Sequence, residues 1–132
     1  MKVVSTSHAP AAIGPYSQAI DLGNMVFVSG QIPVDPATGK MADTVEEQAA
    51  QSLANLKAIL AEAGLSMANV VKTVIFLADI NDFAAVNAEV AVGIVVFLDS
   101  HGSCSPFLFC VYSVADSKHF IFSLPESGKA KF

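Results

Sequence analysis

The chain has 132 residues, of which 53% are hydrophobic and 14% charged, and a formal net charge of −5. This length fits a single domain over residues 1–132 with its own core, and the acidic balance disfavours nucleic acid as a partner. Residues 1–8 lack the apolar stretch of a signal peptide, and no apolar run reaches the roughly 18–20 residues of a membrane span, so we expect a cytoplasmic protein with no membrane partner.

The first half of the chain predicts a hairpin, a loop and a helix, in that order. Alternating residues at 19–22 and 25–29, separated by a Gly-Asn pair, are typical of a β-hairpin. Asp35–Gly39 has turn chemistry throughout and is expected to be an exposed loop. Thr44 and Glu47 form a capping-box pattern, after which apolar residues recur at helical spacing until Gly64, so the helix is predicted over residues 45–63.

The second half is less regular. The β-branched run Val70–Leu77 predicts an internal strand, and Asn81-Asp82 is expected to cap a second helix that begins at Phe83. Residues 91–98 are apolar on every face and fit either a buried helix or a strand. Further strands are predicted at 106–114 and 119–124, with a turn at 115–118 and a frayed tail at 125–132. This alternation of strands and helices predicts an α/β fold.

Composition leaves few chemical groups for an active site. All seven basic residues are lysines, so the chain has no arginine to clamp a carboxylate in a two-pronged contact. Cys104 and Cys110 are expected to be reduced thiols, and with His101 they lack the spacing of a metal site, so no metal is predicted. With so few charges, some apolar surface should remain on the folded monomer, which favours an oligomer.

Two segments near the N-terminus, Ile13–Ile20 and Met25–Pro33, set glycine and proline beside small polar groups and a tyrosine. Together with Asp35–Gly39, the capped helix and Lys72–Leu77, they closely resemble the Rid (YjgF) family of enamine/imine deaminases over residues 8–89. The resemblance implies a chorismate-mutase-like mixed β-sheet backed by two helices, assembled as a homotrimer with inter-subunit clefts. It also implies hydrolysis of 2-enamino and 2-imino acids, such as 2-aminoacrylate, to 2-keto acids and ammonia, without a cofactor.

Mapped residue by residue, the resemblance implies two catalytic positions, Tyr16 and Cys110. It also implies that the substrate is bound by Ser29, Gly30, Gln31, Asn87 and the position of Leu108. Other interpretations of three of these residues stay open: the Tyr16 ring packs on the surface, Gly30 is a β-bulge, and Asn87 is a solvent-facing helix residue.

The chain departs from the family pattern after Glu89. The family strand Pro-Ala-Arg-Ser-Cys-Val aligns with Pro106–Val111, which puts Leu108 where the carboxylate-binding arginine belongs, and the family glutamate falls near Phe122. Loss of the charge-assisted contact costs about 1.5–3 kcal/mol in hydrogen bonding alone. Either the last third of a true homologue has diverged, or a reading-frame or sequence-assignment error follows Glu89, and the abruptness of the change favours the second.

Three functions follow, and the first is favoured. It is the trimeric deaminase acting on a small imino or enamino acid. The second is a ligand-binding or chaperone-like protein of the same fold without chemistry, which the missing arginine supports. The third, an RNA-cleaving inhibitor of translation, is disfavoured by the acidic charge.

Overall fold

The computed structural model describes residues 1–90, 95–99 and 107–114, the last two segments by their backbone. The strands and helices of this part run in the order β1 (Lys2–Val4), β2 (Ala19–Asp21), β3 (Met25–Gln31), α1 (Val45–Glu62), β4 (Val70–Leu77), α2 (Phe83–Val90), β5 (Val95–Asp99) and β6 (Phe107–Val114). Two short 3₁₀ helices, Met67–Asn69 and Ile80–Asp82, precede β4 and α2.

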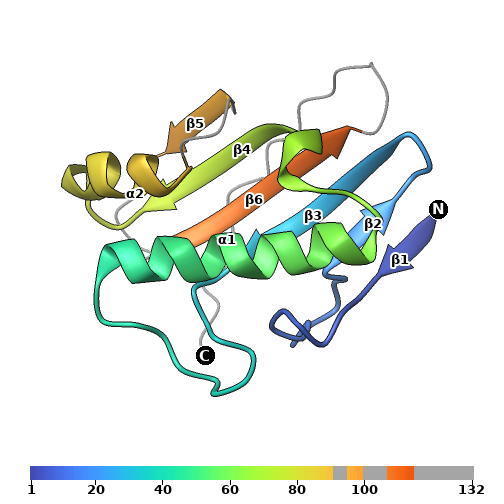
Figure 1. Cartoon of the computed structure of the whole chain (residues 1–132), viewed down its shortest axis with the longest axis horizontal. Coiled ribbons are helices and arrows are strands. Elements are labelled where there is room, and N and C mark those ends of the chain that lie inside the picture. The colour runs from blue at the N-terminus through green and yellow to red at the C-terminus, as the bar shows by residue number, and fades with distance from the viewer. Residues whose placement is uncertain (91–94, 100–106, 115–132) are drawn as a thin grey trace.

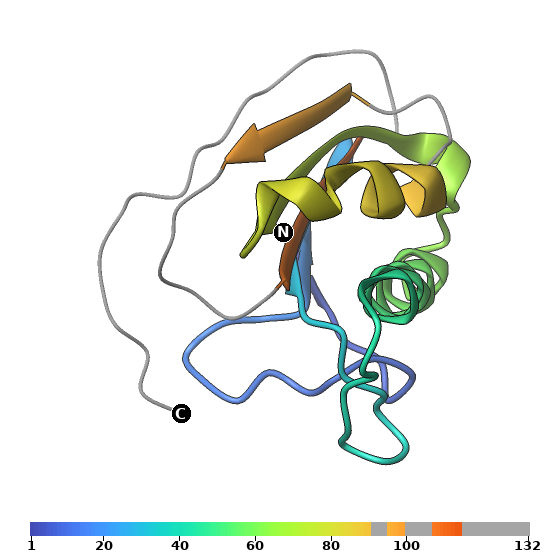
Figure 2. The same ribbon diagram turned by 90° about the vertical axis from the view of Figure 1, so that its left-hand side faces the viewer.

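The strands form one mixed sheet in the order β1-β2-β3-β6-β4-β5. Neighbouring strands are antiparallel, except β4 and β5, which are parallel. Both helices lie on the same face of the sheet, and α1 runs along its length (Figure 1, Figure 2). The predicted mixed sheet backed by two helices is therefore confirmed.

The predicted hairpin is formed by β2 and β3. The backbone N–H of Leu22 donates to the carbonyl oxygen of Met25 at 2.8 Å, which leaves Gly23 and Asn24 as the two residues of the turn. Gly23 has φ +93°, a conformation that residues with a Cβ rarely adopt. The short edge strand β1, which no sequence pattern indicated, pairs with β2 and extends the sheet.

Helix α1 begins at its predicted cap. The Thr44 hydroxyl accepts a hydrogen bond from the Glu47 backbone N–H at 3.3 Å and donates one to the Glu47 carboxylate at 2.9 Å. The helix ends at Glu62, one residue before the predicted end, and Gly64 follows with φ +75°. The buried face packs against the sheet and includes Ala49, Leu53, Leu56, Ile59 and Leu60.

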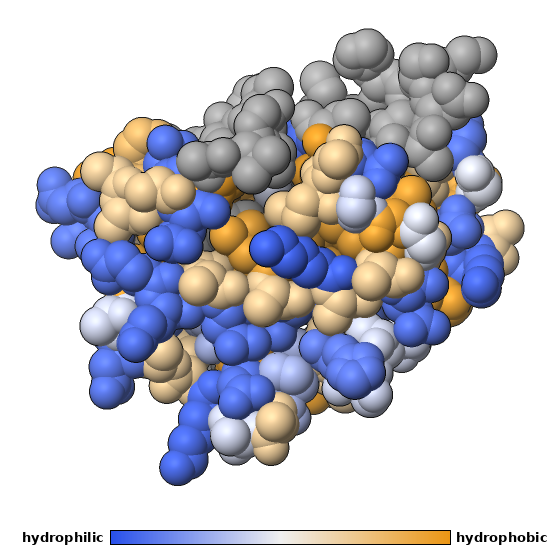
Figure 3. Space-filling model, viewed as in Figure 1, coloured by the Kyte–Doolittle hydropathy of each residue, from blue (hydrophilic) through white to orange (hydrophobic). Residues whose placement is uncertain are grey.

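The outer surface of α1 and the loop before it faces the viewer in Figure 3. Hydrophilic side chains are interspersed there with weakly hydrophobic ones (Figure 3). Exposed alanines at Ala50, Ala54 and Ala61 alternate with exposed charged residues such as Lys57. Helix α1 is therefore amphipathic. Among the described residues, no helix is long and apolar enough to cross a membrane.

Strand β4 is internal, as predicted, because β6 and β5 pair with its two edges. Helix α2 begins at Phe83, also as predicted, but its entry differs. Asp79 caps the preceding 3₁₀ turn by accepting a hydrogen bond from the Asn81 backbone N–H at 2.9 Å. The predicted Asn81-Asp82 cap is therefore wrong: the chain already turns at Asp79, whose carboxylate satisfies the first free N–H group.

The later part of the chain is described in two segments. Within residues 91–98, the segment that fitted a helix or a strand, the described positions from Val95 onward are strand. The predicted strand at 106–114 is confirmed over Phe107–Val114. The turn at 115–118, the strand at 119–124, the tail at 125–132, and the residues His101, Cys104 and Phe122 lie outside the described residues.

Strand β3 contains a bulge opposite β6. Val28 pairs with Val111, whereas Gln31 pairs with Phe109, so three steps along β3 match two along β6. The extra residue falls in the Ser29-Gly30 segment, which confirms the bulge that the sequence left open for Gly30. Since Phe109 and Val111 occupy equivalent positions of the pleat, Val28 and Gln31 share one face of β3.

Candidate functional site

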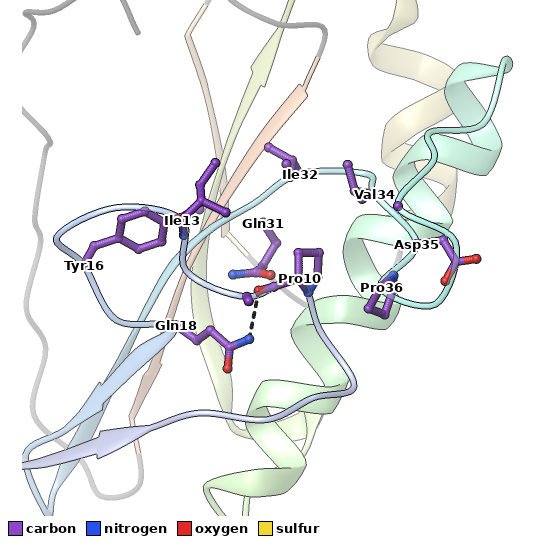
Figure 4. Close-up of a pocket in the computed structure, with 12 residues that line it drawn as sticks. Pro10, Ile13, Tyr16, Gln18, Gln31, Ile32, Val34, Asp35 and Pro36 are labelled. Carbon is purple, nitrogen blue, oxygen red and sulfur yellow. Dashed lines mark hydrogen bonds between the residues drawn. The ribbon is translucent and has the colours of Figure 1, made fainter. Parts of the chain in front are cut away.

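A cavity of about 340 Å³ opens between two loops of the chain (Figure 4). One loop spans residues 10–18 and enters β2, and the other spans residues 30–39 and leaves β3 toward α1. Three residues singled out from the sequence, Tyr16, Gly30 and Gln31, line this cavity. The rest of its described lining is mostly apolar and includes Pro10, Ile13, Ile32, Val34 and Pro36.

Tyr16 lies beside Ile13 at one end of the cavity (Figure 4). Its side chain is 50% exposed, and its hydroxyl oxygen accepts a hydrogen bond from the Ile13 backbone N–H at 3.3 Å. The ring also lies against Gly14: a Cβ at that position would be 3.3 Å from the Tyr16 Cε1 atom. The glycine of the Gly-Pro-Tyr motif therefore lets the ring lie close to the backbone, and the hydroxyl hydrogen stays free to donate to a ligand or water.

Ser29 joins the bulge of β3 to the loop that carries Tyr16. Its hydroxyl donates a hydrogen bond to the Ser17 carbonyl oxygen at 2.5 Å, and its backbone N–H donates to the Gln18 carbonyl oxygen at 2.9 Å. Gln31, which is buried, donates from Nε2 to the Ser29 carbonyl oxygen at 3.0 Å. Gly30 and Gln31 thus line the cavity, while Ser29 stabilises this part of the wall through its hydrogen bonds to the backbone of Ser17 and Gln18.

Two buried amides that sequence reasoning missed hold the walls of the cavity. Gln18 bonds through its side chain to the backbone of residues 6–10, and Asn55 of α1 bonds to the backbone of Ile32 and Val34. Each had a signal in the sequence. Gln18 closes the Gly-Pro-Tyr-Ser-Gln motif, and Asn55 is an amide within the apolar face of α1, where a polar residue needs a partner.

Leu108 and Cys110 lie on β6, the strand next to β3. In register, Leu108 pairs with Phe76 and Cys110 with Val74 of β4. Cys110 also stands between Phe109 and Val111, the two residues whose β3 partners flank the bulge. The backbone at Cys110 is therefore adjacent to the Ser29-Gly30 segment, as the predicted site requires; the side chains of both residues lie outside the described part of the structure.

Asn87 is not brought to this cavity within one chain. It is an exposed residue of α2, and it is not among the described residues that line the space between the two loops. Tyr16, Gly30 and Gln31 therefore gather in one place, whereas Asn87 lies apart from them in the isolated chain.

The cavity offers neutral hydrogen-bonding groups and apolar surface. Asp35 is the charged residue of its described lining, and its carboxylate is already bonded to the Ala37 backbone N–H and the Thr38 hydroxyl, both at 2.9 Å. No group of three or more His, Cys, Asp and Glu side chains within the described residues is placed to hold a metal ion. The described walls can orient a small polar molecule, but they present no cation to its carboxylate.

Comparison with known protein families supports the resemblance that the sequence motifs indicate. A family model described as Endoribonuclease L-PSP matches residues 6–111. The chain belongs to this family, the Rid (YjgF) proteins. The match confirms the resemblance over residues 8–89 and corrects its extent, because it continues through Val111 and includes Leu108 and Cys110. Within the matched residues the sequence keeps the Pro106, Cys110 and Val111 of the family strand pattern.

Relatives within the Rid family include named deaminases. The chain is 52% identical over 110 residues to the 2-iminobutanoate/2-iminopropanoate deaminase of Salmonella typhimurium, with 83% of each chain covered. It is 62% identical over 88 residues to a RutC family protein of Pasteurella multocida, covering 67% of this chain and 68% of that one. A crystal structure of Escherichia coli TdcF with bound serine has a TM-score of 0.80 and 38% identity, covering 86% of this chain and 98% of the other.

Proposed function

We propose that this Rid protein is a hydrolase that deaminates 2-imino and 2-enamino acids to 2-keto acids and ammonia. The observation that carries the proposal is the meeting of Tyr16, Gly30 and Gln31 on one cavity. The chain that holds them is 52% identical to a 2-iminobutanoate/2-iminopropanoate deaminase. A small imino or enamino acid is the proposed ligand.

The proposed reaction needs positioning more than a strong nucleophile. Water adds to the imine carbon and one of its protons passes to the nitrogen; the remaining hydroxyl proton then also passes to the nitrogen as the carbonyl forms, the C–N bond breaks and ammonia leaves. An imine carbon beside a carboxyl group accepts water readily, so orienting the water and moving the proton are sufficient. Tyr16, with a free hydroxyl hydrogen on the cavity wall, is the proposed group for both tasks, and the backbone at Cys110 borders the reacting carbon.

We also propose that the chain is a single domain that acts as a homotrimer in the cytoplasm, with the cavity at a boundary between subunits and without nucleic acid as a partner. Two observations support the boundary. Ile13 and Tyr16 are 73% and 50% exposed at the mouth of the cavity, and Asn87 is exposed away from it. A neighbouring subunit would cover the first two residues and bring its own Asn87 toward the ligand. Light scattering tests the assembly: we expect a mass three times that of the 13.7 kDa chain, and the mass of a single chain would contradict the trimer.

The deaminase proposal is tested by the release of ammonia and 2-keto acid from freshly generated 2-aminoacrylate. Because this compound also hydrolyses in water, the rate without protein is the baseline. Acceleration that scales with protein concentration is the expected result. A folded protein that leaves the baseline unchanged would overturn the proposal.

A second candidate, ligand binding without turnover, is favoured by one observation: Leu108 stands where the family arginine grips the substrate carboxylate. Calorimetric titration with L-serine, the molecule bound in the TdcF crystal, separates the two candidates. Serine binding in a protein that does not accelerate 2-aminoacrylate hydrolysis would favour the second candidate over the first.

A further inference from the structure

The loop that carries Pro10 is held to the sheet by one buried side chain. Gln18 is 3% exposed, and its Oε1 atom accepts a hydrogen bond from the Thr6 backbone N–H at 2.6 Å. Its Nε2 atom donates to the carbonyl oxygens of Thr6, Ala9 and Pro10 at 3.0, 3.3 and 2.8 Å. This orientation of the amide places the NH₂ group against three acceptors and the oxygen against a donor, so the network fixes it.

The opposite wall is held in the same way from α1. Asn55 is 1% exposed, and its Nδ2 atom donates to the carbonyl oxygens of Ile32 and Val34 at 3.0 and 2.9 Å. Its Oδ1 atom accepts a hydrogen bond from Gln51 Nε2 at 2.9 Å, so each polar atom of the amide has a partner. Ile32 and Val34 lie across the cavity from the Pro10 segment (Figure 4).

We propose that Gln18 and Asn55 are positioning residues that set the width of the cavity, each through the loop that it holds. Four hydrogen bonds hold residues 6–10, and all four end on the side chain of Gln18, the residue directly before β2. Pro10 has no backbone N–H, and among the described hydrogen bonds the one from Gln18 is the one that reaches its carbonyl oxygen. The two amides therefore replace the strand pairing that the irregular walls of the cavity lack.

The hydrogen bonds of Gln18 and Asn55 position the cavity walls and do not involve the group proposed to act on the substrate. Gln18, which also lines the cavity, and Asn55 bond backbone atoms of the walls and not the Tyr16 hydroxyl, so we expect their loss to widen the cavity without removing the group proposed to act on the substrate. Contacts made equally in the ground state and the transition state change KM and leave kcat nearly constant. The signature of a positioning role here is therefore a higher KM at an almost unchanged kcat.

Hydrogen–deuterium exchange tests the two tethers, the side-chain amides of Gln18 and Asn55, without any need for turnover. The Gln18→Glu and Asn55→Asp variants keep the shape of the side chain and its acceptor oxygen but remove the NH₂ donor. Gln48→Glu is a matched control, because Gln48 Nε2 donates to the Ala42 carbonyl oxygen at 2.8 Å, away from the cavity. We expect Gln18→Glu to speed exchange at residues 6–12 roughly tenfold or more, and Asn55→Asp to do so at 31–36. Unchanged exchange in these segments, or acceleration spread over the whole chain, would overturn the proposal.

A kinetic measurement rests on the proposed function and tests its connection to the tethers. With 2-iminobutanoate generated in the assay, we expect KM to rise about five- to tenfold in both tether variants, kcat to stay within about twofold, and the Gln48 variant to match the parent. Gln18→Met and Asn55→Leu repeat the test without new charge if the acidic variants do not fold. Inactivity of the parent chain counts against the deaminase, whereas normal KM values in tether variants with loosened loops count against the positioning role.

Discussion

The Ser29 hydroxyl donates its hydrogen to the Ser17 carbonyl oxygen, which ties the bulge of β3 to the segment that carries Tyr16. The sequence resemblance places Ser29 among the ligand-facing residues, but the structure gives its hydroxyl hydrogen a partner in the protein. We therefore expect Ser29 to act on the cavity also by holding the tyrosine segment in position.

Replacing this hydroxyl should lower both stability and activity. We expect Ser29→Ala to reduce the free energy of unfolding by about 1 kcal/mol, the usual net value of one hydrogen bond, and to lower kcat/KM because the tyrosine segment loosens. Urea unfolding and steady-state kinetics measure the two effects. Ser17→Ala is the control, since Ser17 contributes its backbone carbonyl and not its side chain. Identical behaviour of the two variants would contradict this account.

Removing the Tyr16 hydroxyl should affect activity far more than stability. The side chain is half exposed and its hydroxyl makes one long contact with the Ile13 N–H, so Tyr16→Phe should cost less than about 0.5 kcal/mol in unfolding free energy. If the hydroxyl orients water and moves the proton, kcat falls by roughly 10²-fold. Thermal melts and initial rates on 2-aminoacrylate measure both effects. Full activity in the phenylalanine variant would remove Tyr16 from the proposed mechanism.

Restoring an arginine on β6 should strengthen substrate binding. Leu108→Arg supplies a planar donor pair for the substrate carboxylate, and we expect KM to fall by roughly ten- to a hundredfold, equivalent to about 1.5–3 kcal/mol. Leu108→Lys is the matched control, because a flexible point charge cannot make the two-pronged contact and should recover less. Equal KM values in the parent and the arginine variant would show that the carboxylate is bound elsewhere.

Thr73 offers a prediction about stability alone. Its hydroxyl is fully buried on β4, on the face it shares with Ile75 and Leu77, and has no hydrogen-bond partner in the described structure. Thr73→Val keeps the shape and removes the orphan oxygen, so the free energy of unfolding should rise by about 1–2 kcal/mol. Thr38→Val is the contrasting variant, since the exposed Thr38 hydroxyl bonds Asp35. Destabilisation by Thr73→Val, measured by urea unfolding, would indicate a bound water at this hydroxyl.

Much of the fold could be predicted because its signals are local. The Gly23-Asn24 turn, the Thr44 cap and the apolar repeat of α1 each act within a few residues, and each forms where the pattern indicates. The predicted entry to α2 differs from the structure because Asp79 and Asn81 both have capping side chains, and local preference does not show that Asp79 caps a 3₁₀ turn ahead of the helix. The edge strand β1 covers three residues, which is too short for a periodic pattern.

The site was predictable only where a motif marked it. Tyr16, Gly30 and Gln31 were found through the Rid resemblance, and their shared cavity supports it. Gln18 acts through backbone carbonyls 8 to 12 residues away and Asn55 through carbonyls 21 and 23 residues away, and sequence spacing alone does not reveal such contacts. The proposed role of Asn87 depends on a second copy of the chain, a relationship that no pattern within one sequence contains.

The bulge in β3 also limits how this protein can change in evolution. Loss of one residue between Val28 and Gln31 would remove the bulge and restore regular pairing, with Gln31 still opposite Phe109 and on the same face as Val28. A substitution at Ser29 or Gly30 alters one contact, whereas a deletion there removes the bulge itself, and with it the local bend and twist that it gives β3 beside the cavity. Among natural variants, we therefore expect the length of this short segment to be fixed even where its residues differ.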